Sequence, residues 1–104
     1  MGADPRINEE LIEARIREIH DALQMLRELT SRDYSRMSVY EILSMRYLVI
    51  QLVEAASSIC IHILIAAFDE KPEGFPECFS RLAKKGVLPE DLAEKLASAA
   101  RLKN

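Results

Sequence analysis

The strongest constraint in this sequence is an almost uncharged run from Tyr47 to Phe68, in which Glu54 is the one formally charged side chain. A helix of this length and composition is long enough to cross a bilayer. However, a carboxylate near the middle of such a helix costs about 2.5 kcal/mol in lipid. The preceding segment, residues 5–31, also has the amphipathic pattern of a water-soluble bundle. We therefore interpret the run as part of the central helix of a soluble bundle, and we expect no membrane association.

Helix signals cover the first two thirds of the chain. Near the N-terminus, isoleucines and leucines recur three or four residues apart, which places them on one helical face. This first helix is expected to open at Asp4-Pro5, with Asp4 as the N-cap, and to run to about residue 31. The next helix is expected over about residues 39–68, because Ser38 and Glu41 have the spacing of a capping box.

Two shorter helices are expected after a charged loop that contains Pro and Gly. The first spans about residues 77–85 and is stopped by Gly86, which supplies a left-handed C-cap. Pro89 opens the last helix, whose inner face we expect to carry Leu92 and Leu96. No segment alternates apolar and polar residues as a strand does. The sequence thus predicts an all-α fold, an antiparallel up-and-down bundle of about four helices.

Composition limits the chain to one domain. Of its 104 residues, 49% are apolar and 30% are charged, which fits a single domain over residues 1–104 and leaves too few residues for a second core. The net charge of −3 is spread evenly, so neither half resembles a nucleic-acid-binding tail. The second helix is apolar around most of its circumference, and the other helices are too few to cover it. We therefore expect a homodimer or a larger oligomer.

Cys60 and Cys78 are interpreted as buried, reduced thiols. The first residues lack the basic and apolar regions of a secretory signal, which favours a cytoplasmic, reducing location. Together with His20 and His62, the two cysteines offer too few ligands at short spacing for a metal site. We accordingly expect no disulfide framework, no metal and no cofactor.

A stripe of polar side chains, here termed the polar stripe, runs along one face of the second helix. Cys60 lies on the opposite face. At about 100° per residue, the members of the stripe fall on one narrow face. Glu54 and His62 are about 12 Å apart along the helix axis, which is too far for a direct acid–base pair. Either the stripe lines a functional cleft, or it hydrogen-bonds to neighbouring helices and faces solvent. Its members are Tyr40, Ser44, Tyr47, Gln51, Glu54, Ser58 and His62.

Basic side chains gather in the last two helices. They offer a local positive surface for RNA phosphates. Alternatively, because acidic residues lie between them, they form ordinary solvated helix faces. The residues are Arg81, Lys84, Lys85, Lys95, Arg101 and Lys103.

Two stretches resemble the HepT-like proteins of the HEPN superfamily. The run RYLVIQLVEAA (residues 46–56), continuing through His62, is similar to the second helix of that family, and FSRLAKKGVLPEDLAEKL (residues 79–96) resembles its next two helices. The resemblance implies a dimerising all-α protein, encoded beside a minimal nucleotidyltransferase as a prokaryotic toxin–antitoxin pair. It also implies a metal-independent ribonuclease, which the nucleotidyltransferase antitoxin silences by adding AMP to a tyrosine.

The family's catalytic signature is an Arg, usually followed by Asn, with a His a few residues later and a nearby Tyr as the AMP acceptor. The His acts as general acid or base on the ribose hydroxyl, and the Arg neutralises charge on the phosphate. Lys103-Asn104 occupies the Arg-Asn position, and Arg101 is an alternative cation. The resemblance thus implies catalytic positions at these three residues, with a supporting cleft formed by Arg46, Tyr47, Gln51, Glu54, Ser58 and His62.

The signature His and Tyr would follow Asn104. We therefore expect this chain to be a HEPN-like domain that is C-terminally truncated, or a degenerate member of its family. The full-length form should be an endoribonuclease, whereas this chain should not cleave RNA. The alternative hypothesis is a non-catalytic helical binding module that docks on a minimal nucleotidyltransferase or presents substrate to it. The two hypotheses differ in whether a His and a Tyr follow residue 104.

Overall fold

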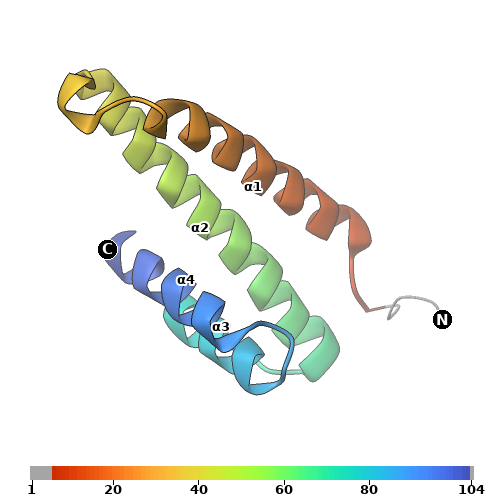
Figure 1. Cartoon of the computed structure of the whole chain (residues 1–104). Coiled ribbons are helices and arrows are strands. Elements are labelled where there is room, and N and C mark those ends of the chain that lie inside the picture. The colour runs from red at the N-terminus through yellow and green to blue at the C-terminus, as the bar shows by residue number, and fades with distance from the viewer. Residues whose placement is uncertain (1–5, 104) are drawn as a thin grey trace.

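Two helical hairpins make up the fold, a long one and a short one packed against its side (Figure 1). The computed structural model describes residues 6–103, with the backbone alone for residues 102 and 103. The expected all-α fold is confirmed, and its dimensions are 48 × 24 × 20 Å. The long hairpin consists of α1 (Glu9–Thr30) and α2 (Val39–Phe68), joined through a 3₁₀ turn (Tyr34–Arg36), and the short hairpin consists of α3 (Phe75–Lys84) and α4 (Glu90–Lys103).

Side-chain caps set where α1 and α2 begin. The Ser38 hydroxyl accepts a hydrogen bond from the Glu41 N–H (3.1 Å), and the Glu41 carboxylate accepts one from the Ser38 N–H (3.2 Å). The predicted capping box of α2 is therefore confirmed. α1 begins later than expected, because the Asn8 side chain caps it by accepting from the Leu11 N–H (3.1 Å). The expected N-cap, Asp4, lies outside the described residues.

Left-handed residues follow both α2 and α3. Gly86 has φ +74°, as the sequence predicts, and the Val87 N–H behind it donates to the Leu82 carbonyl (3.0 Å). Asp69 also adopts the left-handed region of backbone conformation, with φ 53°. The N–H groups of Asp69 and Glu70 both donate to the Leu64 carbonyl. These bonds occupy carbonyls that a helix end leaves without partners.

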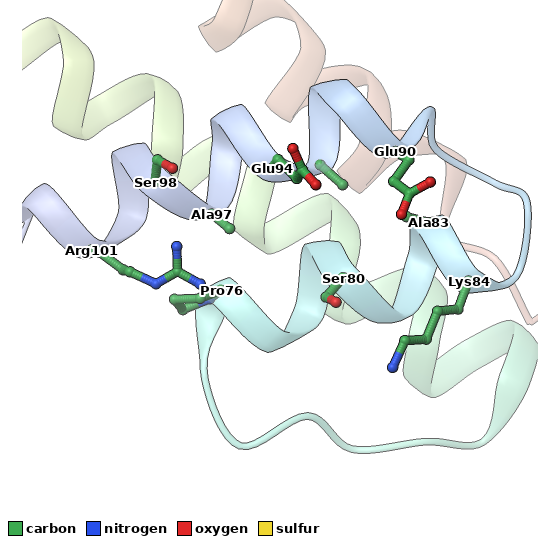
Figure 2. Close-up of a pocket in the computed structure, with 10 residues that line it drawn as sticks. Pro76, Ser80, Ala83, Lys84, Glu90, Glu94, Ala97, Ser98 and Arg101 are labelled. Carbon is green, nitrogen blue, oxygen red and sulfur yellow. The ribbon is translucent and has the colours of Figure 1, made fainter.

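The short hairpin packs on the C-terminal half of α2, and a shallow hollow lies between its two helices (Figure 2). One apolar core joins the three helices. Its buried members are Val53, Cys60 and Leu64 from α2, Cys78, Phe79 and Leu82 from α3, and Ala93, Ala97 and Ala100 from α4.

The inner face of α4 differs from the sequence prediction. Leu92, expected inside, is 42% exposed, whereas Ala93, Ala97 and Ala100 are buried. Alanine side chains are short, so they let α4 approach α2 and α3 closely. A row of small residues therefore faces the core. Apolar periodicity alone places Leu92 on the wrong side, whereas Leu96 packs against the core as predicted.

The two cysteines are paired, which corrects the expectation of reduced thiols. Cys60 on α2 and Cys78 on α3 form a disulfide, with their Cα atoms 6.1 Å apart. Both are buried, as expected. They lie 18 residues apart on different helices and meet only because α3 packs on α2. In the chain-entropy account, closing a loop of this size stabilises a fold by about 3 kcal/mol.

The N-terminal half of α2 extends beyond the short hairpin (Figure 1). Large apolar side chains are exposed there, with Tyr40 at 82%, Leu43 at 52% and Tyr47 at 65%. Together with Met25 of α1, they form what we term the open face. By length and composition alone, α2 could also cross a membrane, a property that core helices of soluble proteins share.

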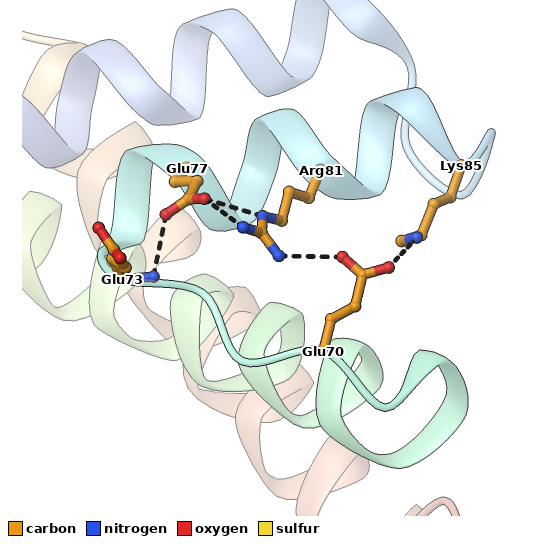
Figure 3. A network of polar contacts seen from close by, with 5 residues as sticks. All are labelled: Glu70, Glu73, Glu77, Arg81 and Lys85. Atoms are coloured by element: carbon orange, nitrogen blue, oxygen red, sulfur yellow. Dashed lines mark hydrogen bonds and ion pairs between the residues drawn. The ribbon is translucent and has the colours of Figure 1, made fainter.

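An ion-pair network joins the end of α2 to α3 (Figure 3). Arg81 donates to Glu70 (3.0 Å) and to Glu77 (2.9 Å), and Lys85 pairs with the second oxygen of Glu70. Hydrogen bonding from Lys85, and then from Arg81, holds the pKa of Glu70 below its ordinary value of 4.5. The Glu73 backbone N–H and then Arg81 lower the pKa of Glu77 in the same way. Both carboxylates are thus favoured in the ionised form by the folded chain.

Replacing the N-cap of α2 should destabilise the fold. We expect Ser38→Ala to lower the free energy of unfolding by about 1 kcal/mol, because the Glu41 N–H loses its acceptor. Urea unfolding followed by circular dichroism measures the change. Ser44→Ala is the matched control, since Ser44 is exposed within the same helix and Ala favours helix there. An equal loss in both variants would contradict the role of the cap.

The ion-pair network should make stability depend on acid pH. Because the pKa of Glu70 is lowered on folding, its contribution is complete above pH 4.5 and is lost as the pH falls through the lowered value. We therefore expect Glu70→Gln to lower the urea midpoint at pH 7. On acidification, the urea midpoint of this variant should fall by less than that of the unmodified chain. Glu13→Gln, at an exposed position on α1, is the control. An equal fall of the urea midpoint on acidification in the unmodified chain and in Glu70→Gln would exclude this role for Glu70.

Candidate functional site

The polar stripe of α2 lines two adjoining hollows against α1. The larger, of about 580 Å³, includes Tyr40 and Ser44. The smaller, of about 280 Å³, includes Glu54 and Ser58. Tyr47 and Gln51 line both hollows. Of the predicted cleft residues, the structure therefore brings Tyr47, Gln51, Glu54 and Ser58 together.

Arg15 and Glu18 complete the smaller hollow from α1, and the sequence analysis missed them. Arg15 donates through Nη1 to Glu18, while its Nε is buried and has no acceptor within residues 6–103. Glu54 also takes part in a polar interaction. A signal for Arg15 exists, since it lies three residues after Ile12 and four before Ile19 and so shares their helical face. The hollow thus has the character of a polar contact between two packed helices.

His62 lies apart from these hollows. Its Nε2 accepts a hydrogen bond from the Asn8 N–H (2.8 Å). Because Asn8 also caps α1, this bond ties the start of α1 to the C-terminal half of α2. Glu54, in contrast, lines the smaller hollow. The two residues are therefore placed in different surroundings, consistent with their separation along the helix.

A third hollow, of about 460 Å³, lies between α3 and α4. Figure 2 shows the guanidinium of Arg101 beside Pro76 at one end, with Lys84 toward the other end. Glu90 and Glu94 project from α4, so the lining carries both signs of charge. Small residues complete the lining, namely Ser80, Ala83, Ala93, Ala97 and Ser98.

Two of the three predicted catalytic positions, Arg101 and Lys103, fall at the end of α4. Arg101 is exposed in the last turn and lines the hollow between α3 and α4. Lys103 is the last residue of α4, and its side chain is outside the part of the chain described. Asn104 lies outside the described residues. Arg46, the remaining predicted cleft residue, is exposed on α2 and lines none of the three hollows.

In the α3–α4 hollow, Arg101 and Lys84 can attract an anion, whereas the carboxylates of Glu90 and Glu94 oppose one. The Arg101 guanidinium has the donor geometry that binds phosphate oxygens. Neither His20 nor His62 lines this hollow, so the described residues supply no imidazole beside Arg101 for proton transfer. No group of three or more His, Cys, Asp or Glu residues suited to a metal ion occurs in the described part of the chain.

Comparison with protein families gives one clear result. Residues 12–104 match the family model HepT-like, described as ribonuclease HepT-like. The matched range includes α1 from Ile12 onward, all of α2 and α3, α4, the polar stripe and the three predicted catalytic positions. Neither the curated proteins nor the solved structures give a match. On the family match, this chain belongs to the HepT-like family, ribonuclease HepT-like.

Proposed function

We propose that this chain is the toxin component of a prokaryotic toxin–antitoxin pair and acts in the cytoplasm on RNA. The observation that carries the proposal is the family match over residues 12–104, because the HepT-like family is described as ribonuclease. In this proposal, the family's activity is that of a metal-independent endoribonuclease, and a minimal nucleotidyltransferase is the antitoxin.

The proposed RNA contacts lie at the end of α4. In this proposal, Lys103-Asn104 takes the family's Arg-Asn position, and Arg101 is an alternative cation. Arg101 is exposed beside a hollow, so a phosphodiester can approach its guanidinium without displacing the core. A cation in this position neutralises charge that develops on the phosphate during cleavage. Arg46, Tyr47, Gln51, Glu54, Ser58 and His62 are proposed as supporting groups.

Proton transfer is the part of the reaction that residues 1–104 do not supply in this proposal. The signature requires an imidazole a few residues after the Arg, and the histidines of this chain are His20 and His62. His62 is engaged with the backbone of Asn8. We therefore propose that the 104-residue chain binds RNA without cleaving it. The second candidate is a non-catalytic module that docks on a nucleotidyltransferase. It is favoured by the same observation, that neither His20 nor His62 lines the hollow beside Arg101.

We also propose that the open face of α2 is the homodimer surface. Tyr40, Leu43 and Tyr47 are large and exposed, and with Met25 they line a continuous hollow. Removing such a surface from water is favourable by roughly 25 cal/mol for each Å². Exposed apolar patches of this kind mark association surfaces. A second copy of the chain, related by a twofold axis, buries the same face on both subunits.

RNA binding should depend on Arg101. We expect Arg101→Ala to weaken binding of a short single-stranded RNA and to reduce the slope of log affinity against log salt by about 0.7, the value of one phosphate contact on a single strand. Fluorescence anisotropy at several salt concentrations measures both. Lys95→Ala is the matched control, since it removes an exposed charge from α4 that does not line the hollow.

Two results would speak against this proposal. Equal effects of Arg101→Ala and Lys95→Ala would show that binding is not centred on the end of α4. Cleavage of the RNA by the 104-residue chain, in the presence of a metal chelator, would show that an imidazole after Arg101 is not required. Capture of a minimal nucleotidyltransferase by a chain that neither binds nor cleaves RNA would favour the second candidate.

Association should depend on the open face. We expect the chain to have the mass of two copies in light scattering and Leu43→Glu to shift it toward the monomer, because a buried, unpaired carboxylate is costly. Leu92→Glu is the matched control, since Leu92 is also an exposed leucine but lies on α4. Circular dichroism shows whether each variant remains folded. A monomeric unmodified chain, or a dimer that survives Leu43→Glu, would exclude this interface.

A further inference from the structure

The disulfide lies inside the core that joins the short hairpin to α2. Cys60 is 2% exposed and Cys78 is 0% exposed. Leu64 and Phe79 are buried in the same cluster. Thiol–disulfide exchange requires a thiolate to reach one of the two sulfur atoms. In the closed fold, the surrounding side chains block that approach.

The short hairpin is held on α2 by three kinds of contact. These are the apolar core, the disulfide and the ion pairs of Glu70 with Arg81 and Lys85. Residues 69–74 form the covalent connection between α2 and α3. α1 contributes no side chain to this core cluster. Movement of the hairpin away from α2 therefore leaves the packing between α1 and α2 in place.

We infer that the Cys60–Cys78 disulfide is a redox-controlled staple, which fixes the short hairpin on α2 and becomes reducible only when the hairpin opens. This inference does not rest on the proposed function. In reduction, a dithiol gives two electrons and two protons to the disulfide, whose S–S bond breaks to form two thiols, while the dithiol closes into its own disulfide. The reverse reaction uses a small-molecule disulfide as the oxidant.

Burial decides how such a staple behaves in a reducing compartment. Reduction is limited by the fraction of molecules whose hairpin is open, because the closed form hides both sulfur atoms. The reduced chain keeps its apolar core and its ion pairs, so it stays folded but opens more often. The hairpin also carries Arg101. The redox state thus sets how firmly this cation is held relative to α2.

The first experiment measures how fast dithiothreitol reduces the purified chain. Free thiols are trapped with iodoacetamide, and the attached groups are counted by intact mass. Before reduction, we expect iodoacetamide to attach no carbamidomethyl group to the chain. Reduction in native buffer should be at least about a hundredfold slower than in concentrated urea, because native exposure requires opening. Equal rates in buffer and urea, or two attached groups before reduction, would overturn the inference.

The second experiment follows hydrogen exchange in the oxidised chain, the reduced chain and the double variant Cys60→Ala/Cys78→Ala. Amides of α3 and α4 should exchange at least about tenfold faster in the last two than in the oxidised chain, with a smaller change in α1. The control is Ser57→Ala, which alters another fully buried side chain of α2 and should keep the response to reduction. Unchanged protection of α3 after reduction, or equal acceleration of α1, would refute the staple.

Discussion

The need to cover the apolar surface of α2 determines how the rest of the chain is arranged. α1 runs along one side of α2, and the short hairpin covers the C-terminal half (Figure 1). Because α3 and α4 fold back on each other and each is much shorter than α2, they leave the other half uncovered. The exposed aromatic residues near Tyr40 and Tyr47 follow directly from this difference in length. One long apolar helix therefore creates both the internal core and the surface proposed for association.

The junction between α2 and α3 is where the structure concentrates its cross-links. Asp69 ends α2 in a left-handed conformation, Glu70 pairs with two cations of the short hairpin, and Cys60 is bonded to Cys78. These links respond to different conditions, since carboxylate pairs depend on pH and salt whereas a disulfide depends on redox conditions. Loss of one link thus leaves the others in place, so the short hairpin stays on α2 but is held less firmly.

Sequence reasoning succeeded where the determinants are local. The spacing of Ser38 and Glu41 predicted the start of α2, and Gly86 predicted the turn after α3, because each depends on a few neighbouring backbone groups. It failed where partners come from distant segments. The pairing of Cys60 with Cys78 depends on helix packing that the sequence does not encode locally.

The candidate site shows the same division. Placing Tyr47, Gln51, Glu54 and Ser58 on one face required only the helical repeat, and the structure brings these residues together. Arg15 comes from α1, whose rotation about its own axis is set by packing, so its position in that hollow could not be read from the stripe. The three signature positions were predicted from the family resemblance alone, because no physical pattern in the sequence of residues 101–104 marks them as a site.

The alanine row of α4 has a consequence for how this protein can vary. Ala93, Ala97 and Ala100 leave no side-chain length to absorb a change, so a larger residue at any of them must push α4 outward. The size of these methyl side chains therefore sets the distance between the axes of α4 and α2. That distance in turn sets where α4 holds Arg101 relative to α2. Substitutions at these three uncharged positions would therefore change where Arg101 lies relative to α2.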